Sequence, residues 1–206
     1  MSRRNRRLIA IVLTLGLVIL IAVDRLGILF RSRESDRARY HDKTFTIVKV
    51  VDGDTLDLEV EDWFNDKPYT RVRLWGVDTP ETHNWKTSQD SADTKVPSPM
   101  YFGPEASEFA KRLVLNKRVR VQLEPVEGTR GKYRRLLAYI YLPDGRMLNE
   151  ELIQQGYGYA DERFRHMHRR RFLDLQKEAQ REQHGLWKDV KPEQMPEWYR
   201  KRRERK

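Results

Sequence analysis

Four carboxylates stand at two predicted turns in the first part of this 206-residue chain. Asp52 and Asp54 flank a glycine in one turn, and Asp78 and Glu81 flank a Thr-Pro pair where a strand-like stretch ends. With no histidine or cysteine beside them, these oxygens suit a hard divalent cation, Ca²⁺ or Mg²⁺, and the carbonyl of Thr79 could add an oxygen ligand. Aspartates are also common in turns because they accept hydrogen bonds from nearby backbone N–H groups, so a structural role is the alternative.

Two arginines, Arg73 and Arg135, are candidates for binding phosphate. A guanidinium presents a fork of N–H donors that matches two phosphate oxygens. Arg73 lies in the alternating stretch that leads to Asp78, and Arg135 begins another strand-like stretch. Solvated charge on a strand edge is the alternative for each arginine taken singly. The chain has no Ser-His-Asp, H-E-x-x-H or Walker spacing, so covalent-hydrolase, zinc-protease and P-loop functions lack support.

Apolar runs and apolar–polar alternation predict five strands, and helical spacing and helix end signals predict three helices that could position these side chains. The predicted strands cover residues 44–51, 55–61, 69–76, 118–124 and 136–142, and the predicted helices cover residues 103–116, 147–155 and 165–183. A three-strand meander, a helix and a two-strand pair follow the element order of an OB-type barrel. The predicted fold is therefore α+β, a five-stranded OB-fold barrel with three helices. If the first and third strands are neighbours, the two acidic turns meet at one barrel end.

Two finer expectations concern the second strand and the longest loop. The alternation in the second strand predicts that Leu56, Leu58 and Val60 face the core and that Thr55, Asp57 and Glu59 face water. The stretch from His83 to Met100 has no periodicity and is predicted to be a long loop, which in a compact domain is either functional or mobile.

The amino end predicts a membrane segment. Residues 8–23 contain only Thr14 and Gly16 among aliphatic side chains, and an apolar run resumes at residues 26–30. A transmembrane helix over residues 8–30 would be about 35 Å long, enough to cross a hydrocarbon core of about 30 Å. Four arginines among the first seven residues should stay on the cytoplasmic side, which places the body outside the cytoplasm. A cleaved signal peptide is the alternative, although no clear small-x-small cleavage site follows the run.

The net charge of +10 belongs to the ends of the chain. Residues 42–187 are formally neutral, while residues 188–206 carry an excess of lysine and arginine. The charge therefore favours contact of the tails with a polyanion or a membrane surface and does not by itself make the body a nucleic-acid binder. The charged, proline-bearing tail is predicted to be partly disordered. The absence of cysteine excludes disulfides and thiolate metal sites.

Five motifs in order resemble the thermonuclease, or staphylococcal-nuclease-like, family over residues 44–187. They read V-V-D-G-D-T at 50–55, R-L-W-G-V-D-T-P-E-T at 73–82, Y-F-G-P-E-A-S at 101–107, K-Y-R-R-L-L-A-Y-I-Y at 132–141 and D-G-R-M-L-N-E-E-L-I-Q-Q-G at 144–156. The resemblance implies an OB-fold nuclease that hydrolyses DNA and RNA phosphodiesters with Ca²⁺ and leaves 3′-phosphate ends. Asp54 and Asp78 match the family's calcium carboxylates. Thr79 matches its backbone-carbonyl ligand, and Asp52 matches the acid at the metal's periphery.

The resemblance also implies roles for three other side chains. Glu81 matches the acid proposed as general base towards the attacking water, and Arg73 and Arg135 match the two phosphate-binding arginines. The family usually has glycine just before the second arginine, where this chain has Arg134. That difference could change the turn or add a third phosphate contact.

These observations predict four segments and one function. Residues 1–30 are predicted to form a membrane anchor or signal peptide, residues 31–42 a linker, residues 43–187 the nuclease-like barrel domain and residues 188–206 a basic tail. The predicted protein is a monomeric, membrane-anchored, extracytoplasmic, Ca²⁺-dependent nuclease acting on DNA and RNA. The alternative is a non-catalytic OB-fold module that binds nucleic acid or a protein and is tethered to the membrane.

Overall fold

A computed structural model describes residues 5, 9, 12–16, 31–82, 100–125 and 128–204. Within these residues, no helix has both the length and the apolar character needed to cross a membrane. Most of the predicted membrane segment, and the predicted long loop except Met100, lie outside the described residues, so both stay predictions. The chain divides into two units, residues 1–39 and 40–206, and each is considered by itself.

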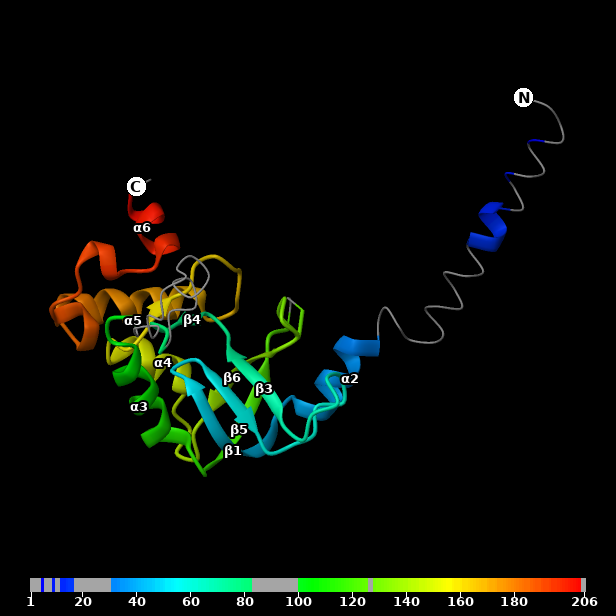
Figure 1. Cartoon of the computed structure of the whole chain (residues 1–206), viewed down its shortest axis with the longest axis horizontal. Coiled ribbons are helices and arrows are strands. Elements are labelled where there is room, and N and C mark those ends of the chain that lie inside the picture. The colour runs from blue at the N-terminus through cyan, green and yellow to red at the C-terminus, as the bar shows by residue number, and fades with distance from the viewer. Residues whose placement is uncertain are drawn as a thin grey trace, which may run out of the picture. The chain divides into compact units, whose positions relative to one another are not determined.

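Five strands close into a barrel, which confirms the predicted OB-type architecture (Figure 1). The strands are β1 (Lys43–Asp52), β2 (Thr55–Leu58), β3 (Thr70–Leu74), β5 (Arg118–Leu123) and β6 (Leu136–Tyr141). Their order around the barrel is β1-β2-β3-β6-β5. β3 and β6 run parallel, and the other neighbours run antiparallel. Aliphatic side chains from every strand fill the interior, because alternate residues of a strand share one face. Fully buried examples are Ile47, Leu56, Leu58, Val72, Val119, Val121, Leu123, Leu136 and Ile140.

The second strand departs from its predicted pattern. β2 ends at Leu58, earlier than predicted, and all four of its residues are buried. Thr55 and Asp57 were predicted to face water, and that prediction is wrong for both: each is only 2% exposed. The carboxylate of Asp57 accepts two hydrogen bonds from the guanidinium of Arg71 on β3, at 2.8 and 2.9 Å. The cross-strand register places Asp57 opposite Arg71, so the buried charge is paired.

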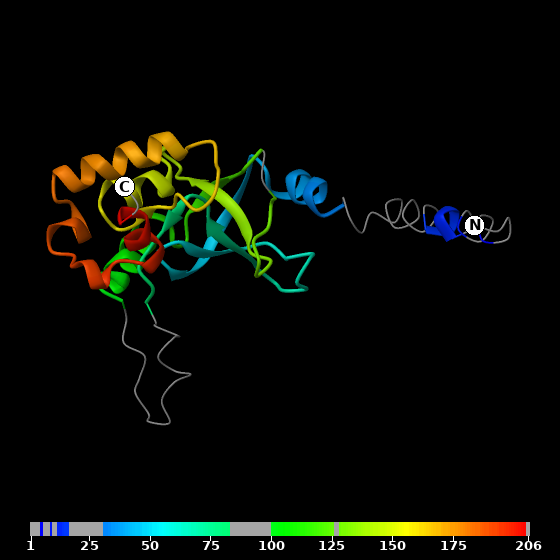
Figure 2. The same ribbon diagram turned by 90° about the horizontal axis from the view of Figure 1, so that it is seen from above.

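Three helices lie together on one side of the barrel (Figures 1 and 2). They are α3 (Gly103–Val114), α4 (Leu148–Gln154) and α5 (Arg169–Arg181), which match the predicted helices with shorter bounds. Their apolar faces join the barrel core through Ala110, Val114, Leu148, Leu152, Ile153, Phe172 and Leu175. A small sheet that the sequence did not predict pairs β4 (Val77–Asp78) with β7 (Tyr159–Ala160). It joins the segment after α4 to the strand end that carries Asp78.

The segment predicted as a non-periodic linker, residues 31–42, contains a helix, α2 (Arg31–Tyr40). A helix that is polar all round has no apolar stripe, so the lack of periodicity did not exclude it. Tyr40 belongs to the barrel unit, where it is fully buried, and its hydroxyl lies 3.1 Å from Oγ1 of Thr70. The role of residues 31–42 as a linker stays a prediction.

The carboxyl-terminal tail is structured where the sequence predicted partial disorder. Residues 185–203 form two short 3₁₀ helices, η2 (Gly185–Lys188) and η3 (Pro192–Gln194), and then α6 (Glu197–Arg203). Tyr199 of α6 is 6% exposed and packs in a second hydrophobic cluster with Tyr159 and Leu186. The prediction of disorder was based on the charge and the prolines of the tail and did not consider its aromatic side chains. Burial of aromatic rings can offset the entropy lost when a short segment becomes ordered.

Two glycines hold the start of this tail against α4. Gly156 and Gly185 both have positive φ, at 70° and 50°. A Cβ on Gly156 would lie 2.1 Å from the carbonyl oxygen of His184, and one on Gly185 would lie 2.4 Å from that of Gly156. The N–H of Leu186 donates to the carbonyl of Gly156 at 2.9 Å. Backbone packs directly on backbone here, and no side chain can enter the contact.

We expect Gly156→Ala to destabilise the protein far more than Gly145→Ala. Gly145 also has positive φ, 88°, but a Cβ there meets nothing within 4 Å, so its substitution should cost about 1–2 kcal/mol of unfolding free energy. The clash at Gly156 should add about 1–3 kcal/mol. Urea unfolding of both variants measures the difference. Equal destabilisation would contradict the close backbone contact.

Candidate active site

The two acidic turns meet because β2 lies between β1 and β3. Asp52 at the end of β1 pairs with Thr55 at the start of β2, and Thr55 in turn pairs with Arg73 near the end of β3. The N–H of Leu74 donates to the carbonyl of Asp54 at 2.8 Å, which fixes the first turn against the end of β3. The sequence predicted that the turns could converge if the first and third strands were neighbours. They are not, and each flanks β2 instead.

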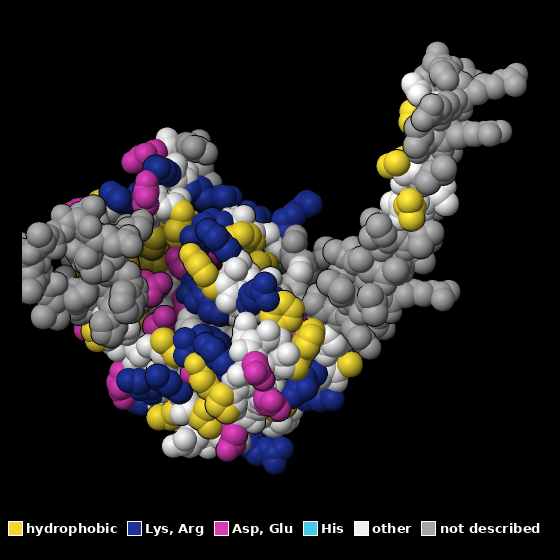
Figure 3. Space-filling view, turned by 45° about the vertical axis from the view of Figure 1, so that its right-hand side comes forward, with side chains coloured by type: hydrophobic (Ala, Val, Ile, Leu, Met, Phe, Trp, Pro, Cys, Tyr) yellow, Lys and Arg dark blue, Asp and Glu magenta, His cyan; other side chains and the backbone are white. Residues whose placement is uncertain are grey.

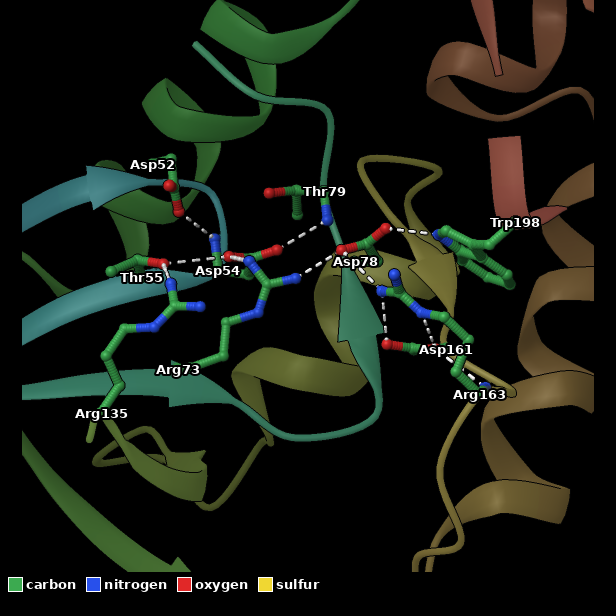
Figure 4. A network of polar contacts seen from close by, with 10 residues as sticks. All are labelled: Asp52, Asp54, Thr55, Arg73, Asp78, Thr79, Arg135, Asp161, Arg163 and Trp198. Atoms are coloured by element: carbon green, nitrogen blue, oxygen red, sulfur yellow. Dashed lines mark hydrogen bonds and ion pairs between the residues drawn. The ribbon is translucent and has the colours of Figure 1, made fainter. Parts of the chain in front are cut away.

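One guanidinium joins the two turns. Nη1 of Arg73 binds Oδ1 of Asp54, and Nη2 binds Oδ1 of Asp78 (Figure 4). The carboxylate of Asp54 is fully buried, and only small fractions of the Arg73 and Asp78 side chains are exposed. A buried ion pair is stable only where further hydrogen bonds satisfy its remaining polar atoms. Asp54 accepts such bonds from the N–H of Thr79 at 2.8 Å and from Oγ1 of Thr55 at 3.2 Å.

The side chain of Thr79 packs closely against the backbone at Gly53. A Cβ on Gly53 would lie 2.8 Å from Oγ1 of Thr79, so only glycine fits without a shift. That Oγ1 is itself buried and has no hydrogen-bond partner within the part of the chain that the structure describes. A buried hydroxyl without a partner is costly, and such atoms are found at sites that bind something further.

The electrostatics of this cluster favour an added positive charge. Burial raises the pKa of Asp54 well above its usual value; Arg73 opposes this shift, while Asp52 and Asp78 add to it. Burial alone would lower the pKa of Arg73, but Asp54 and Asp78 outweigh burial and raise it. The charge of the Arg73 guanidinium is thus stabilised by four carboxylates, those of Asp52, Asp54, Asp78 and Glu81.

Glu81 and Arg135 complete the cluster. Burial raises the pKa of Glu81, and the charge of Asp52 adds to that rise, while Arg73 opposes it. Burial lowers the pKa of Arg135, and the nearby guanidinium of Arg73 lowers it further. Nη1 of Arg135 donates to Oγ1 of Thr55 at 3.3 Å. All seven side chains nominated from the sequence therefore lie at one end of the barrel.

The donor set fits a hard divalent cation in its chemistry. Asp52, Asp54 and Asp78 supply only oxygen, and the charges of Asp52 and Asp78 raise the pKa of Asp54, while Arg73 and the N–H of Thr79 oppose that rise. Within the described residues, no three Asp, Glu, His or Cys side chains are arranged to hold a metal. The guanidinium of Arg73 stands between the carboxylates of Asp54 and Asp78.

Sequence reasoning missed two further partners of Asp78. Nη2 of Arg163 lies 3.2 Å from Oδ1 of Asp78 and also binds Asp161, and Nε1 of Trp198 donates to Oδ2 of Asp78 at 2.7 Å (Figure 4). Nothing in the sequence marks Arg163. The apolar residues Met195, Trp198 and Tyr199 are spaced as on one face of a helix, and that signal could have indicated that the tail packs, but not that it packs against Asp78.

Arg134 occupies a left-handed backbone position, with φ of 61°. This conformation explains why glycine suits the position, and the arginine adopts it at a cost of about 1–2 kcal/mol. Its guanidinium lies 4.6 Å from the ring centroid of Phe64, and its carbonyl accepts a hydrogen bond from Arg130. The turn before Arg135 is thus retained, and a phosphate contact by Arg134 stays a prediction.

A pocket of about 190 Å³ lies beside Arg135 and is lined by basic, aromatic and polar side chains. Its lining residues are Asp62, Asn65, Lys67, Tyr69, Arg71, Tyr133 and Arg135. Tyr133 is 72% exposed, and Arg135 lies 5.7 Å from its ring centroid. Figure 3 shows one face of the molecule on which Lys and Arg side chains lie between hydrophobic ones. Cations beside exposed aromatic rings suit the backbone and bases of a single nucleic-acid strand.

Comparison with known proteins agrees with this geometry. Residues 71–189 match the model of the family described as staphylococcal nuclease homologue. The chain is 31% identical over 183 residues to a thermonuclease of Staphylococcus hyicus, covering 85% of this chain and 97% of that protein. It is 32% identical over 151 residues to a thermonuclease of Staphylococcus intermedius, covering 70% and 76% of the two chains. It is 28% identical over 157 residues to an uncharacterised endonuclease of Escherichia coli, covering 74% and 80%. The chain therefore belongs to the staphylococcal nuclease homologue family.

Proposed function

We propose that this protein is a Ca²⁺-dependent nuclease that hydrolyses phosphodiester bonds of DNA and RNA and leaves 3′-phosphate ends. The observation that carries the proposal is the Asp54–Arg73–Asp78 bridge, with Glu81 and Arg135 beside it at one barrel end. Relatives described as thermonucleases and as an endonuclease support a nuclease.

Arg73 and Arg135 are proposed to bind the oxygens of the scissile phosphate. A phosphodiester resists attack by water because it is anionic, and negative charge grows as the phosphorus becomes pentacoordinate. Two fixed guanidiniums stabilise that charge without reorganisation during the reaction. The raised pKa of Arg73 keeps it charged, and arginine remains protonated even where burial lowers its pKa, as at Arg135.

Glu81 is proposed to accept the proton of the attacking water. Its raised pKa, caused first by burial, makes it a stronger base than an exposed glutamate. A positioned base contributes about 10²–10⁴-fold to rate.

Asp54, Asp78 and the carbonyl of Thr79 are proposed to hold Ca²⁺, with Asp52 at its periphery. When bound, the cation would neutralise charge on the phosphate and polarise it towards attack. The surplus of carboxylates around Arg73 supports this choice.

We propose that the protein acts as a monomer outside the cytoplasm, anchored by residues 8–30. The basis is the apolar run behind four arginines in the sequence. Extracellular calcium modules work with dissociation constants of about 10⁻⁴–10⁻³ M, so an extracytoplasmic location suits a site of weak calcium affinity.

We expect Arg73→Lys to lower the rate of cleavage of single-stranded DNA by about 10²–10³-fold, because a lysine cannot bridge two turns and also present a fork to phosphate. Arg120→Lys is the matched control: it lies on the barrel strand β5 and pairs with an aspartate, Asp42, and it belongs neither to the carboxylate cluster nor to the lining of the pocket beside Arg135. Initial rates of the full-length chain in detergent with Ca²⁺ measure the effect, and urea unfolding checks both folds. Equal losses of cleavage rate in the two variants would mean that Arg73 has no specific role in the reaction.

We expect Glu81→Gln to lose about 10²–10⁴-fold in cleavage while it still binds single-stranded DNA, because glutamine keeps the shape but accepts no proton from water. EGTA should stop cleavage by the unsubstituted chain, and added Ca²⁺ should restore it. Gel-based cleavage and fluorescence anisotropy give the two measurements. An unsubstituted chain that binds DNA in excess Ca²⁺ without cutting it would favour the non-catalytic binding module.

A further inference from the structure

The carboxyl-terminal helix reaches the candidate active site from outside the family-matched segment. The match ends at residue 189, and Trp198 lies beyond it in α6. Its indole Nε1 donates to Oδ2 of Asp78 at 2.7 Å, across 120 residues of chain (Figure 4). No local sequence pattern produces this contact, so the packing of α6 must create it.

The two carboxylate oxygens of Asp78 have different hydrogen-bond and ion-pair partners. Oδ1 faces Arg73, which also binds Asp54, and Arg163 lies 3.2 Å from the same oxygen. Oδ2 is bound by the indole. The terminal torsion of an aspartate has a broad energy minimum, so its own rotamer preference leaves the carboxylate plane loosely defined. The indole hydrogen bond to Oδ2 therefore helps to fix the carboxylate plane, with Oδ1 directed at Arg73 and Arg163.

The indole is itself held firmly. Its ring packs edge-on against Tyr159 and Tyr199, with centroids 6.5 and 5.6 Å apart, and Arg163 lies 4.7 Å from the ring centroid. Tyr159 of β7 pairs with Asp78 of β4, so the support and the supported carboxylate belong to one small sheet. The hydroxyl of Tyr199 accepts a hydrogen bond from Gln180 of α5 at 2.8 Å.

A second tryptophan provides an internal comparison. Trp187 also packs edge-on against Tyr159, at 5.1 Å, and lies in the same cluster. Its Nε1 is buried and has no hydrogen-bond partner in the part of the chain that the structure describes. The two indoles thus share a packing environment, and only that of Trp198 contacts Asp78.

We propose that Trp198 is a positioning residue that orients the carboxylate of Asp78 for a divalent cation, so that α6 completes the active site. This inference rests on the proposed function in taking Asp78 as a calcium ligand. Hydrogen bonds from outside to a metal-binding side chain fix its direction, and their loss costs about 10–100-fold in metal affinity or activity.

The test compares Trp198→Phe with Trp187→Phe in the full-length chain. Each variant keeps an aromatic ring and loses one indole N–H. Two quantities are measured for each: the Ca²⁺ concentration dependence of the thermal unfolding midpoint, which reports affinity without catalysis, and the Ca²⁺ dependence of cleavage. We expect Trp198→Phe to bind Ca²⁺ about 10–100-fold more weakly, with much of its cleavage rate restored at saturating Ca²⁺. Trp187→Phe should keep the unsubstituted affinity.

Each contrary outcome overturns the inference. Equal Ca²⁺ affinity in the two variants would mean that the indole N–H positions nothing. Tighter binding or faster cleavage by Trp198→Phe would mean that the indole obstructs the carboxylate. If the unsubstituted chain binds Ca²⁺ and cleaves DNA while the variants do not differ, the inference alone fails. If the unsubstituted chain neither binds nor cleaves, the proposed function fails with it.

Discussion

The structure depends on one buried ionic bridge, in which the guanidinium of Arg73 joins the carboxylates of Asp54 and Asp78. A carboxylate removed from water is stable only beside an opposite charge and hydrogen-bond donors, and removing one member of such a pair costs about 3–5 kcal/mol. Asp54 obtains its donors from Thr55 and Thr79, which belong to different turns. The charges therefore fix the turns to each other, and the barrel end has one arrangement that satisfies them.

The strand register supplies that arrangement. β2 is only four residues long, yet it pairs with β1 and β3, so its first residue, Thr55, contacts both the turn before it and the end of β3. The fully buried side chain of Asn149 connects α4 to the barrel: its amide N–H donates to the carbonyl of Trp75, and its amide oxygen accepts a hydrogen bond from the N–H of Ile140. The corner between β3 and β4 is thus held from the barrel and from the helices. A side chain on such rigid elements keeps its geometry better than one on a loop.

The sequence predicts the parts of this design that local patterns encode. Apolar runs at β1 and β6 and alternation at β2, β3 and β5 are enough to propose the barrel, and the acids lie in or beside the turns between these strands. Long-range pairing is not encoded locally. The alternation of β2 places Asp57 outside, and only the register opposite Arg71 buries it. Arg163 and Trp198 reach Asp78 because β7 and α6 pack beside β4, and no pattern near either residue indicates that.

Because the tail is folded, fewer of its positive side chains are free to bind a polyanion. Its positive residues were expected to lie on a partly disordered end, able to reach any polyanion. On α6, Arg202 binds Glu162 at 2.6 Å, and Lys201 binds Glu197 at 2.6 Å, so part of that charge is neutralised within the domain. Tyr199 holds the helix in place, and Trp198 is thereby directed at Asp78. The aromatic residues of the tail, rather than its charge, therefore determine its place in the structure, because burying a ring favours one position and a solvated charge does not.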